Sequence, residues 1–306
     1  MSKKKICFIV NPISGSQKSR QINRVFLAAH LDADRYDFDI LHTEHKGHGM
    51  ELAKKAIVEG CDVVTAVGGD GTVREIGSVL VDTDKAMAII PTGSGNGFSR
   101  DLGIPMNLEG ALAVINAGAQ RAVDTGKIRS LKEVPAKWTS FMSNAGIGFD
   151  AYMSDKFDKL EKRGLWSYIK AIWKEFWAYE IHEYRLVIDG KEIKRKSWLI
   201  TFANACQYGN NATVAPNALL DDGLFDVCIV PKFPNWKLPI LLYRFFHNSI
   251  DKSGYLEVIR GKSIQVFKKV AYAQIDGDFI QLEENLEVEI NPASLKVVVP
   301  KVVVPK

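Results

Sequence analysis

Three glycine-rich loops in the first hundred residues constrain the fold more than any other feature of the chain. The loops read NPISGS (11–16), GGDGT (68–72) and PTGSGNG (91–97), and they follow the apolar runs KKKICFIV, DVVTAV and AMAIIP. Another strand is expected at YDFDILHT, and helical patterns such as GMELAKKAIVEG and TVREIGSVLV lie between the apolar runs. Strands that alternate with helices indicate a parallel sheet with both faces covered.

The position of these loops predicts a ligand site. Ligands of parallel sheets bind at the carboxyl ends of the strands, where all three loops fall. Glycine lets another group approach the backbone closely, and a helix N-terminus attracts phosphate. The loops therefore predict a phosphate-binding crevice, with a chance clustering of turn glycines as the alternative. None of them has the P-loop or Rossmann glycine spacing, which disfavours both of those folds.

Asp70 is the carboxylate inside the glycine loops. It could cap the helix expected from near Thr72, since Asp is a favoured N-cap residue. It could instead hold the Mg²⁺ of a nucleotide, or order the loop by accepting hydrogen bonds from backbone N–H groups.

The second half of the chain has a different pattern. From about residue 126, stretches such as YRLVIDG, FDVCIVP and LEVEI read as strands joined by short polar turns. We therefore expect an α/β domain over 1–125 and an antiparallel β-sandwich or flattened barrel over 126–290. The tail, 291–306, is a candidate to return to the first domain and to end as a strand with an exposed stub.

Two segments of the second half mix aromatic and basic residues. A helix expected over about 152–180 carries the apolar residues Met153, Ile169, Trp173 and Phe176 beside several lysines, and FPNWKLPILLYRFFHNSI (233–250) is similar. Such a stripe indicates core packing or, alternatively, a basic amphipathic helix that lies on a membrane.

Composition narrows the classes of function. The net charge of +4 permits attraction to an anionic membrane but is too small to indicate nucleic-acid binding. The four cysteines are far apart, which favours reduced thiols in a cytoplasmic protein over a zinc or redox centre. His42, His45 and His48 are read as part of a solvated loop rather than as a metal site.

Six ordered motifs resemble the diacylglycerol kinase catalytic family, which also contains sphingosine and ceramide kinases. They are NPISG, GGDGT, PTGSGNGFSRDLGIP, NAGIGFDA (144–151), APNALLDDGLFDV (215–227) and IDGD (275–278), and they span essentially the whole chain. Within this family the chain looks most like the soluble bacterial lipid kinases.

The resemblance implies an ATP site in the crevice between the two domains of an NAD-kinase/diacylglycerol-kinase-like fold. It implies Asp276 as the catalytic aspartate, with Asp278 and Asp70 as further catalytic candidates that could organise Mg²⁺. It also implies a structural Mg²⁺ held by Leu219, Asp222 and Leu224, partly through main-chain oxygens. The implied nucleotide-binding residues are Asn11, Pro12, Ser14, Gly15, Thr43, Gly68, Gly69, Asp70, Gly71, Thr72, Val73, Arg74, Gly93, Ser94, Gly95 and Asn96.

Three positions depart from the family pattern. Asp278 stands where the family has glutamate, so its carboxylate is one methylene shorter. Asn96-Gly97 replaces the usual Asn-Asp, and Arg74 replaces the commoner asparagine. Asp276-Gly277 is also an ordinary hairpin signal, which is the alternative to a catalytic role.

The leading hypothesis is an ATP-dependent lipid kinase that phosphorylates a hydroxyl of diacylglycerol or of a related lipid alcohol such as a sphingoid base. We expect a cytoplasmic protein that associates peripherally with the membrane, and exposed strand edges would allow a homodimer. An NAD kinase is the second hypothesis, but the order of APNALLDDGLFD before IDGD favours a lipid kinase. A nucleotide- or lipid-binding sensor without turnover is the third, because of the shortened Asp278.

Overall fold

The computed structural model describes residues 3–132, 135, 137–158, 165–267, 272–282 and 284–301. Contacts within the chain divide it into two compact units, Met1–Val123 with Ala293–Lys306, and Asp124–Pro292. The expected exposed stub at 302–306 lies outside the described residues.

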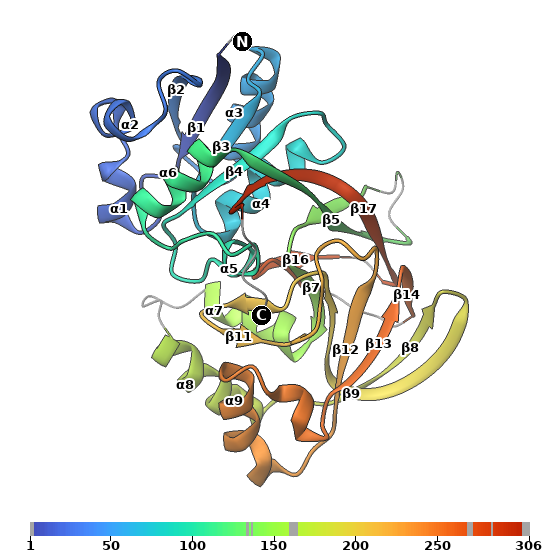
Figure 1. The fold of residues 1–306 in the computed structure, drawn as a ribbon. Helices are drawn as coiled ribbons and strands as arrows, with labels where there is room; N and C mark the ends of the chain where they lie inside the picture. Colours follow the sequence, from blue (N-terminus) through green and yellow to red (C-terminus); the bar gives the residue numbers. More distant parts are fainter. Residues whose placement is uncertain are drawn as a thin grey trace. The chain divides into compact units, whose positions relative to one another are not determined.

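The first unit contains a parallel sheet in the strand order β4-β3-β1-β2 (Figure 1). The strands are β1 (Lys4–Val10), β2 (Tyr36–His42), β3 (Val63–Gly68) and β4 (Ala86–Pro91). The end of β17 (Leu286–Val299) pairs in parallel with β4 through Lys296 and Val297. Strands β3 and β4 are buried along their whole length, as expected for a parallel sheet covered on both faces.

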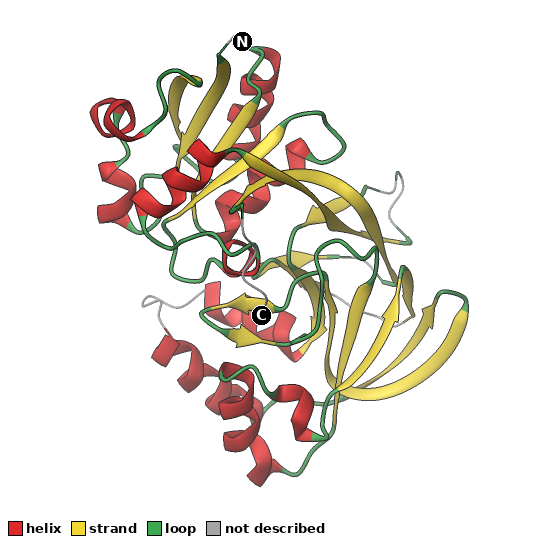
Figure 2. Ribbon diagram, in the orientation of Figure 1, coloured by secondary structure: helices red, strands yellow, loops and turns green. Residues whose placement is uncertain are grey.

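Helices alternate with these strands (Figure 2), which confirms the predicted α/β class. They are α1 (Ser16–Gln21), α2 (Arg24–His30), α3 (His48–Val58), α4 (Asp70–Leu80), α5 (Gly97–Asp101) and α6 (Leu108–Ala117). The helical spacing of QKSRQINRVFLAAHL (17–31) predicts one helix after the first loop, but the structure has two. Ile22 is extended, and the side chain of Asn23 accepts a hydrogen bond from the Phe26 N–H at 2.9 Å, so a new helix begins there.

The second unit is built from antiparallel strand pairs, which confirms the second part of the fold prediction. Its main path runs β16-β15-β7-β9-β8-β14-β17, while β12 pairs with β9 and β13, and β5 pairs with β6. The strands are β5 (Ala119–Ser130), β6 (Thr139–Phe141), β7 (Asn144–Gly148), β8 (His182–Ile188), β9 (Lys191–Ala203), β10 (Gln207–Gly209), β11 (Ala212–Thr213), β12 (Phe225–Pro231), β13 (Glu257–Gly261), β14 (Ser263–Phe267), β15 (Tyr272–Ile275) and β16 (Asp278–Gln281).

Three apolar clusters of buried residues lie in the described part of this unit, and the two larger ones organise it. One gathers alternate residues of the strands, including Ile147, Ile200 and Ile275. The other gathers aromatic and aliphatic side chains such as Phe176, Trp198 and Leu241 around the helices. In place of one helix over 152–180, the structure has α7 (Phe149–Asp158) and α8 (Leu165–Phe176), and residues 159–164 lie outside the described residues. The segment 233–250 forms η1 (Asn235–Lys237) and α9 (Leu238–Phe246), and η2 (Ile250–Ser253) follows.

Candidate functional site

The glycine loops of the first unit are joined by backbone hydrogen bonds at the carboxyl ends of its strands. The Asn11 N–H donates to the Val67 carbonyl at 2.9 Å, and the Thr92 N–H donates to the Gly68 carbonyl at 2.9 Å. Thr43, just beyond β2, donates its N–H to the Val10 carbonyl at 2.9 Å. The structure therefore brings all three loops and Thr43 to one edge of the sheet.

Side chains add a second set of links between the loops. Asn11 Nδ2 donates to Thr72 Oγ1 at 3.1 Å, and Asn11 Oδ1 accepts from the Ser14 N–H at 3.3 Å. The hydroxyl of Ser19 donates to Thr92 Oγ1 at 3.1 Å. These bonds link the loops to one another and to α1.

Two glycines are needed because the loops approach so closely. A Cβ on Gly93 would lie 2.5 Å from the Gly69 Cα, which is closer than real side chains allow. Gly15 has a φ of +55°, and its Cβ would lie 1.9 Å from the Thr92 carbonyl oxygen. These two glycines therefore set the spacing of the loops.

Asp70 orders the loop that follows β4. Its two carboxylate oxygens accept hydrogen bonds from the N–H groups of Asn96 and Gly97, each at 2.8 Å. Gly69 is the N-cap of α4, so the helix begins at Asp70 rather than near Thr72, and Asp70 does not act as its cap. The bonds instead satisfy N–H groups at the N-terminus of α5.

The other predicted nucleotide residues differ in accessibility. The side chains of Thr72 and Val73 are buried, at 6% and 3% exposure, so they pack within the unit and offer a ligand little surface. Ser94 is exposed, while Pro12, Gly71, Arg74 and Gly95 are half-buried. Of the residues on α4 that were predicted to contact the nucleotide, Arg74 is therefore the one whose long polar side chain reaches the surface.

Asp276 lies in the second unit, in the turn between β15 and β16. Asp276 and Gly277 have φ of +48° and +86°, and Ile275 pairs with Asp278, as in a tight two-residue hairpin. The Asp276 carboxylate accepts N–H bonds from Met142 at 2.8 Å, Ser143 at 2.7 Å and Asn144 at 3.1 Å. The structure is therefore compatible with both interpretations of Asp276-Gly277, the hairpin turn and the catalytic role, because the turn also fixes the direction of the carboxylate.

The turn proposed for structural Mg²⁺ already contains a cation. Asp222 Oδ2 is paired with the Arg260 guanidinium, and Asp222 Oδ1 accepts the Leu224 N–H at 3.1 Å. Arg260 also lies 3.2 Å from Asp226. The donor set at Leu219, Asp222 and Leu224 therefore does not fit Mg²⁺ while Arg260 keeps this position, because its charge already compensates the carboxylate.

His45 and His48 come together with Glu51 at the start of α3, within reach of one ion. Nδ1 of His48 accepts the Glu44 N–H at 3.1 Å, and the group is largely exposed. Nothing else at this position indicates a ligand, so the solvated-loop interpretation is kept.

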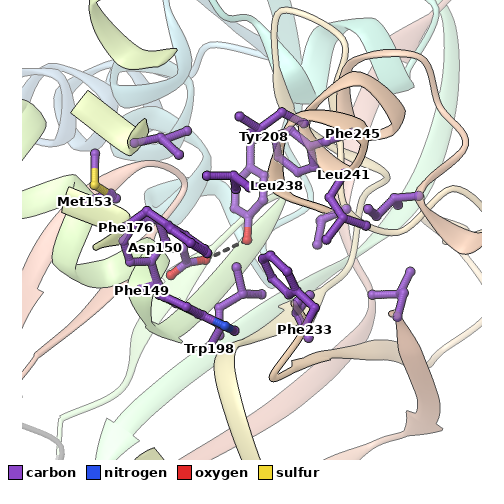
Figure 3. Close-up of a pocket in the computed structure, with 17 residues that line it drawn as sticks. Phe149, Asp150, Met153, Phe176, Trp198, Tyr208, Phe233, Leu238, Leu241 and Phe245 are labelled. Atoms are coloured by element: carbon purple, nitrogen blue, oxygen red, sulfur yellow. Dashed lines mark hydrogen bonds between the residues drawn. The ribbon is translucent and has the colours of Figure 1, made fainter. Parts of the chain in front are cut away.

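An apolar cavity of about 120 Å³ lies within the second unit (Figure 3). Aromatic and leucine side chains surround it, and a hydrogen bond between Asp150 and Tyr208 crosses one side. Seventeen residues line the cavity, and Asp150 is the charged one: Phe149, Asp150, Met153, Ile172, Phe176, Trp198, Leu199, Tyr208, Val214, Val230, Phe233, Leu238, Leu241, Leu242, Phe245, Ile250 and Leu256. A cavity of this composition suits an alkyl chain.

Asp150 is a candidate functional residue that was not predicted from the sequence. Tyr208 Oη donates to Asp150 Oδ2 at 2.6 Å, with Gln274 Nε2 at 3.3 Å and Thr201 Oγ1 at 3.5 Å. Burial raises the pKa of this carboxyl to about 7, although those hydrogen bonds act in the opposite direction. The available signal was its place in NAGIGFDA, directly after a strand of small residues.

Two family models match this chain. The diacylglycerol kinase catalytic domain matches residues 5–128, and the YegS C-terminal NAD kinase β-sandwich-like domain matches residues 143–299. A diacylglycerol kinase of Mycobacterium tuberculosis is 30% identical over 253 residues, covering 82% of this chain and 81% of the relative. A Chromohalobacter salexigens protein named probable lipid kinase YegS-like is 29% identical over 264 residues, covering 83% and 81%.

Solved structures show the same fold. A diacylglycerol kinase from Bacillus anthracis superposes with a TM-score of 0.72 at 21% identity and covers 99% of this chain and 100% of its own. Yeast NADH kinase in complex with NADH gives a TM-score of 0.51 at 10% identity, covering 98% and 85%.

Proposed function

Because the chain belongs to the diacylglycerol kinase family of lipid kinases, we propose that it transfers the γ-phosphate of ATP to a hydroxyl group of a membrane lipid. The acceptor would be diacylglycerol or a related lipid alcohol such as a sphingoid base. The observation that carries this proposal is the apolar cavity of the second unit, because it suits an acyl chain and offers little to the polar NAD molecule.

We place the nucleotide phosphates at the glycine loops of the first unit. The supporting feature is the close packing of Gly69 against Gly93, which leaves backbone rather than side chains at the loop surface. Asp70 would hold the nucleotide Mg²⁺ through its carboxylate, since oxygen ligands are those that Mg²⁺ prefers. The ion would neutralise charge on the phosphates.

Asp276 is our proposed general base. Its three backbone N–H bonds favour the ionised carboxylate and fix its direction, and an ionised carboxylate is the form that can accept the proton of an acceptor hydroxyl. Asp278, half-buried at the start of β16, would assist from the neighbouring position. No step of this mechanism uses Leu219, Asp222 and Leu224.

We further propose a cytoplasmic enzyme that meets its lipid at the membrane surface. The part of the chain that the structure describes has no helix long and apolar enough to cross a membrane. Aromatic side chains that do not line the cavity are exposed in η1, in α9 and at Trp177, directly after α8. Trp236 is 73% exposed, Tyr243 61% and Trp177 58%.

Basic residues accompany this aromatic surface, which suits an anionic bilayer. Lys170 and Lys174 of α8 and Lys232 before η1 are exposed, and the Lys237 ammonium lies 4.3 Å from the centre of the Trp236 ring. Aromatic rings and lysines together favour the headgroup region of anionic membranes.

A homodimer remains a separate prediction, which light scattering of the purified protein would check.

The test is transfer of labelled γ-phosphate from ATP into a mixed lipid extract, with NAD assayed in parallel. Wild type and Asp276→Asn are compared, and both are checked by thermal unfolding and nucleotide binding, because the asparagine of the variant cannot accept all three N–H bonds. We expect wild type to label a lipid and the folded variant to label none.

An Asp278→Glu variant separates the remaining outcomes. Labelled NADP from wild type would replace the proposal with an NAD kinase. No labelled product from wild type, with label appearing in Asp278→Glu, would instead indicate a nucleotide-binding sensor whose carboxylate is one methylene too short.

A further inference from the structure

We propose that a second, polar groove of the second unit binds the phosphate monoester group of a phosphorylated lipid. The groove has a volume of about 380 Å³. Phe176 and Trp198 line both this groove and the apolar cavity, so they form part of the wall between the two. The choice of a phosphorylated lipid rests on the proposed function, because a lipid kinase makes such monoesters, whereas the phosphate site itself does not depend on it.

The groove forms where strand β9 changes its neighbours. On one edge of β9, the residues before Trp198 pair with β8 and the residues after it pair with β7. On the other edge, the partners of the adjacent residues Val230 and Pro231 are the residues on either side of Trp198. Trp198 is therefore the extra residue of a β-bulge, and a bulge bends its strand. The bend and the change of neighbours leave room for the groove at this point of the sheet.

The same register brings two lysines to the groove. Lys232 follows Pro231, which pairs with Ser197, so the chain carries Lys232 past β12 alongside Lys196. Both lysine side chains line the groove and are exposed, and neither has a hydrogen bond or ion pair with a described residue. Two ammonium groups on one groove repel each other, and an anion bound between them would replace this repulsion with attraction.

The other polar groups of the groove leave these two charges available. Of the described residues that line the groove, Glu180 is the only carboxylate, and it pairs with neither lysine. The exposed side chain of Asn235 adds a neutral amide that can donate hydrogen bonds. The lining therefore has a net positive charge and a further donor, which favours an anion over a cation.

The charges and walls of the groove limit the ligand. Lysine binds phosphate as a point charge, and a phosphate monoester carries a charge of about −1.5 to −2 at pH 7. Two ammonium groups match that charge better than they match the single charge of a phosphate diester. Trp177 and Ile181 place apolar surface beside the lysines, which favours a phosphate with an apolar group attached over a fully polar phosphate ester.

The position of the groove suits a ligand that lies in a membrane. Trp177 lines the groove and is 58% exposed, and Asn235 is adjacent in the chain to the exposed Trp236. These aromatic side chains belong to the surface for which we propose membrane contact. A lipid phosphate could therefore enter the groove while its chains stay in the bilayer, and the product of one turnover would help to keep the enzyme at the membrane.

The test is a titration of the protein with dihexanoyl phosphatidic acid below its micelle concentration. The indole N–H signals of the six tryptophans are followed by NMR after selective ¹⁵N labelling, and Trp177→Phe identifies the Trp177 signal. Trp177 lines the groove but not the apolar cavity, so it reports on the groove alone. We expect a saturable shift of this signal in wild type.

Lysine variants assign the shift to the proposed site. Lys196→Gln and Lys232→Gln should each weaken binding about threefold, and together about tenfold, as for exposed ion pairs. Lys194→Gln is the matched control, because Lys194 is exposed on the same strand and on the same face as Lys196 but does not line the groove. It should bind the lipid as wild type does. No saturable shift in wild type, or unchanged binding in the double lysine variant, would overturn the inference.

Two further ligands test the chemical class. Glycerol 3-phosphate is a monoester without chains, and dihexanoyl phosphatidylglycerol is a diester with the same chains, so both should bind several-fold more weakly. Equal binding of glycerol 3-phosphate would overturn the lipid assignment in favour of a soluble phosphate ester. Equal binding of phosphatidylglycerol would overturn the preference for a monoester. The proposed kinase activity is judged separately by phosphate transfer, so a protein that transfers no phosphate yet shows lysine-dependent binding keeps this site and loses the proposed function.

Discussion

Replacing Asp150 by asparagine should stabilise the protein, and the gain should grow as the pH rises. In the folded state burial raises the pKa of Asp150 from 3.8 to about 7. The folded protein therefore holds this proton between these two values while the unfolded chain releases it. The sign follows from proton linkage: stability due to this group is complete below the unfolded pKa and is lost as the pH rises through the folded pKa.

The size of this destabilisation follows from the folded and unfolded pKa values of Asp150. Each pKa unit corresponds to about 1.4 kcal/mol, so the full destabilisation is about 4 kcal/mol at alkaline pH. About 3 kcal/mol of it should develop between pH 5 and pH 8.5. Asparagine has nearly the same shape as aspartate and no charge to bury. The free energy of unfolding of Asp150→Asn, relative to that of wild type, should therefore be about 3 kcal/mol greater at pH 8.5 than at pH 5.

Urea unfolding of both proteins at the two pH values measures this difference, with the tyrosine and tryptophan signals of the second unit as the probe. Asp37→Asn is a control, because the Asp37 side chain is 72% exposed and its removal should change stability by less than about 0.5 kcal/mol. A stability difference between Asp150→Asn and wild type that is the same at pH 5 and pH 8.5 would refute the argument from burial.

Three further outcomes are expected from the structure. Gly93→Ala should weaken ATP binding at least about tenfold and lower stability by about 1–3 kcal/mol, because its Cβ would clash with the Gly69 backbone; unchanged calorimetric titration and unfolding curves would contradict this. Trp236→Ala should weaken co-sedimentation of the protein with anionic vesicles several-fold without changing the unfolding midpoint, since this ring is largely exposed. Equal co-sedimentation of variant and wild type would mean that the surface around Trp236 does not contact the membrane. Mg²⁺ should raise the unfolding temperature of Arg260→Ala more than that of wild type, because the variant vacates the Asp222 carboxylate; an equal rise in both proteins would mean that Arg260 does not compete with the ion.

Local patterns were sufficient to predict the fold class. Alternating apolar runs and helical patterns located the parallel strands, and the loops after β1, β3 and β4 were found at the predicted sheet edge. The break between α1 and α2 was missed because a single capping residue, Asn23, outweighed a helical periodicity that continued across it.

The interactions of the candidate site depend on residues that are distant in the sequence. Asp70 is bound by N–H groups 26 and 27 residues further along, which no local pattern indicates. Asp150 was missed for the same reason: its donors come from three other strands, and its burial depends on helices such as α9. The composition of NAGIGFDA suggested a motif but not the environment of its carboxylate.

Strand β17 has a consequence for how the chain is made. It leaves the second unit at Pro292, and only its residues from Ala293 onward complete the first unit, where the Asp82 N–H donates to the Ser294 carbonyl and Lys296 pairs with Ala86. A ribosome that has released β1 to β4 must therefore synthesise some two hundred further residues before β4 gains this neighbour. Until then β4 is an open sheet edge on the nascent chain, and open edges invite pairing with other chains. Truncation before Ala293 would make that transient state permanent, so we expect such chains to be retained by chaperones or to aggregate even though the glycine loops are all present.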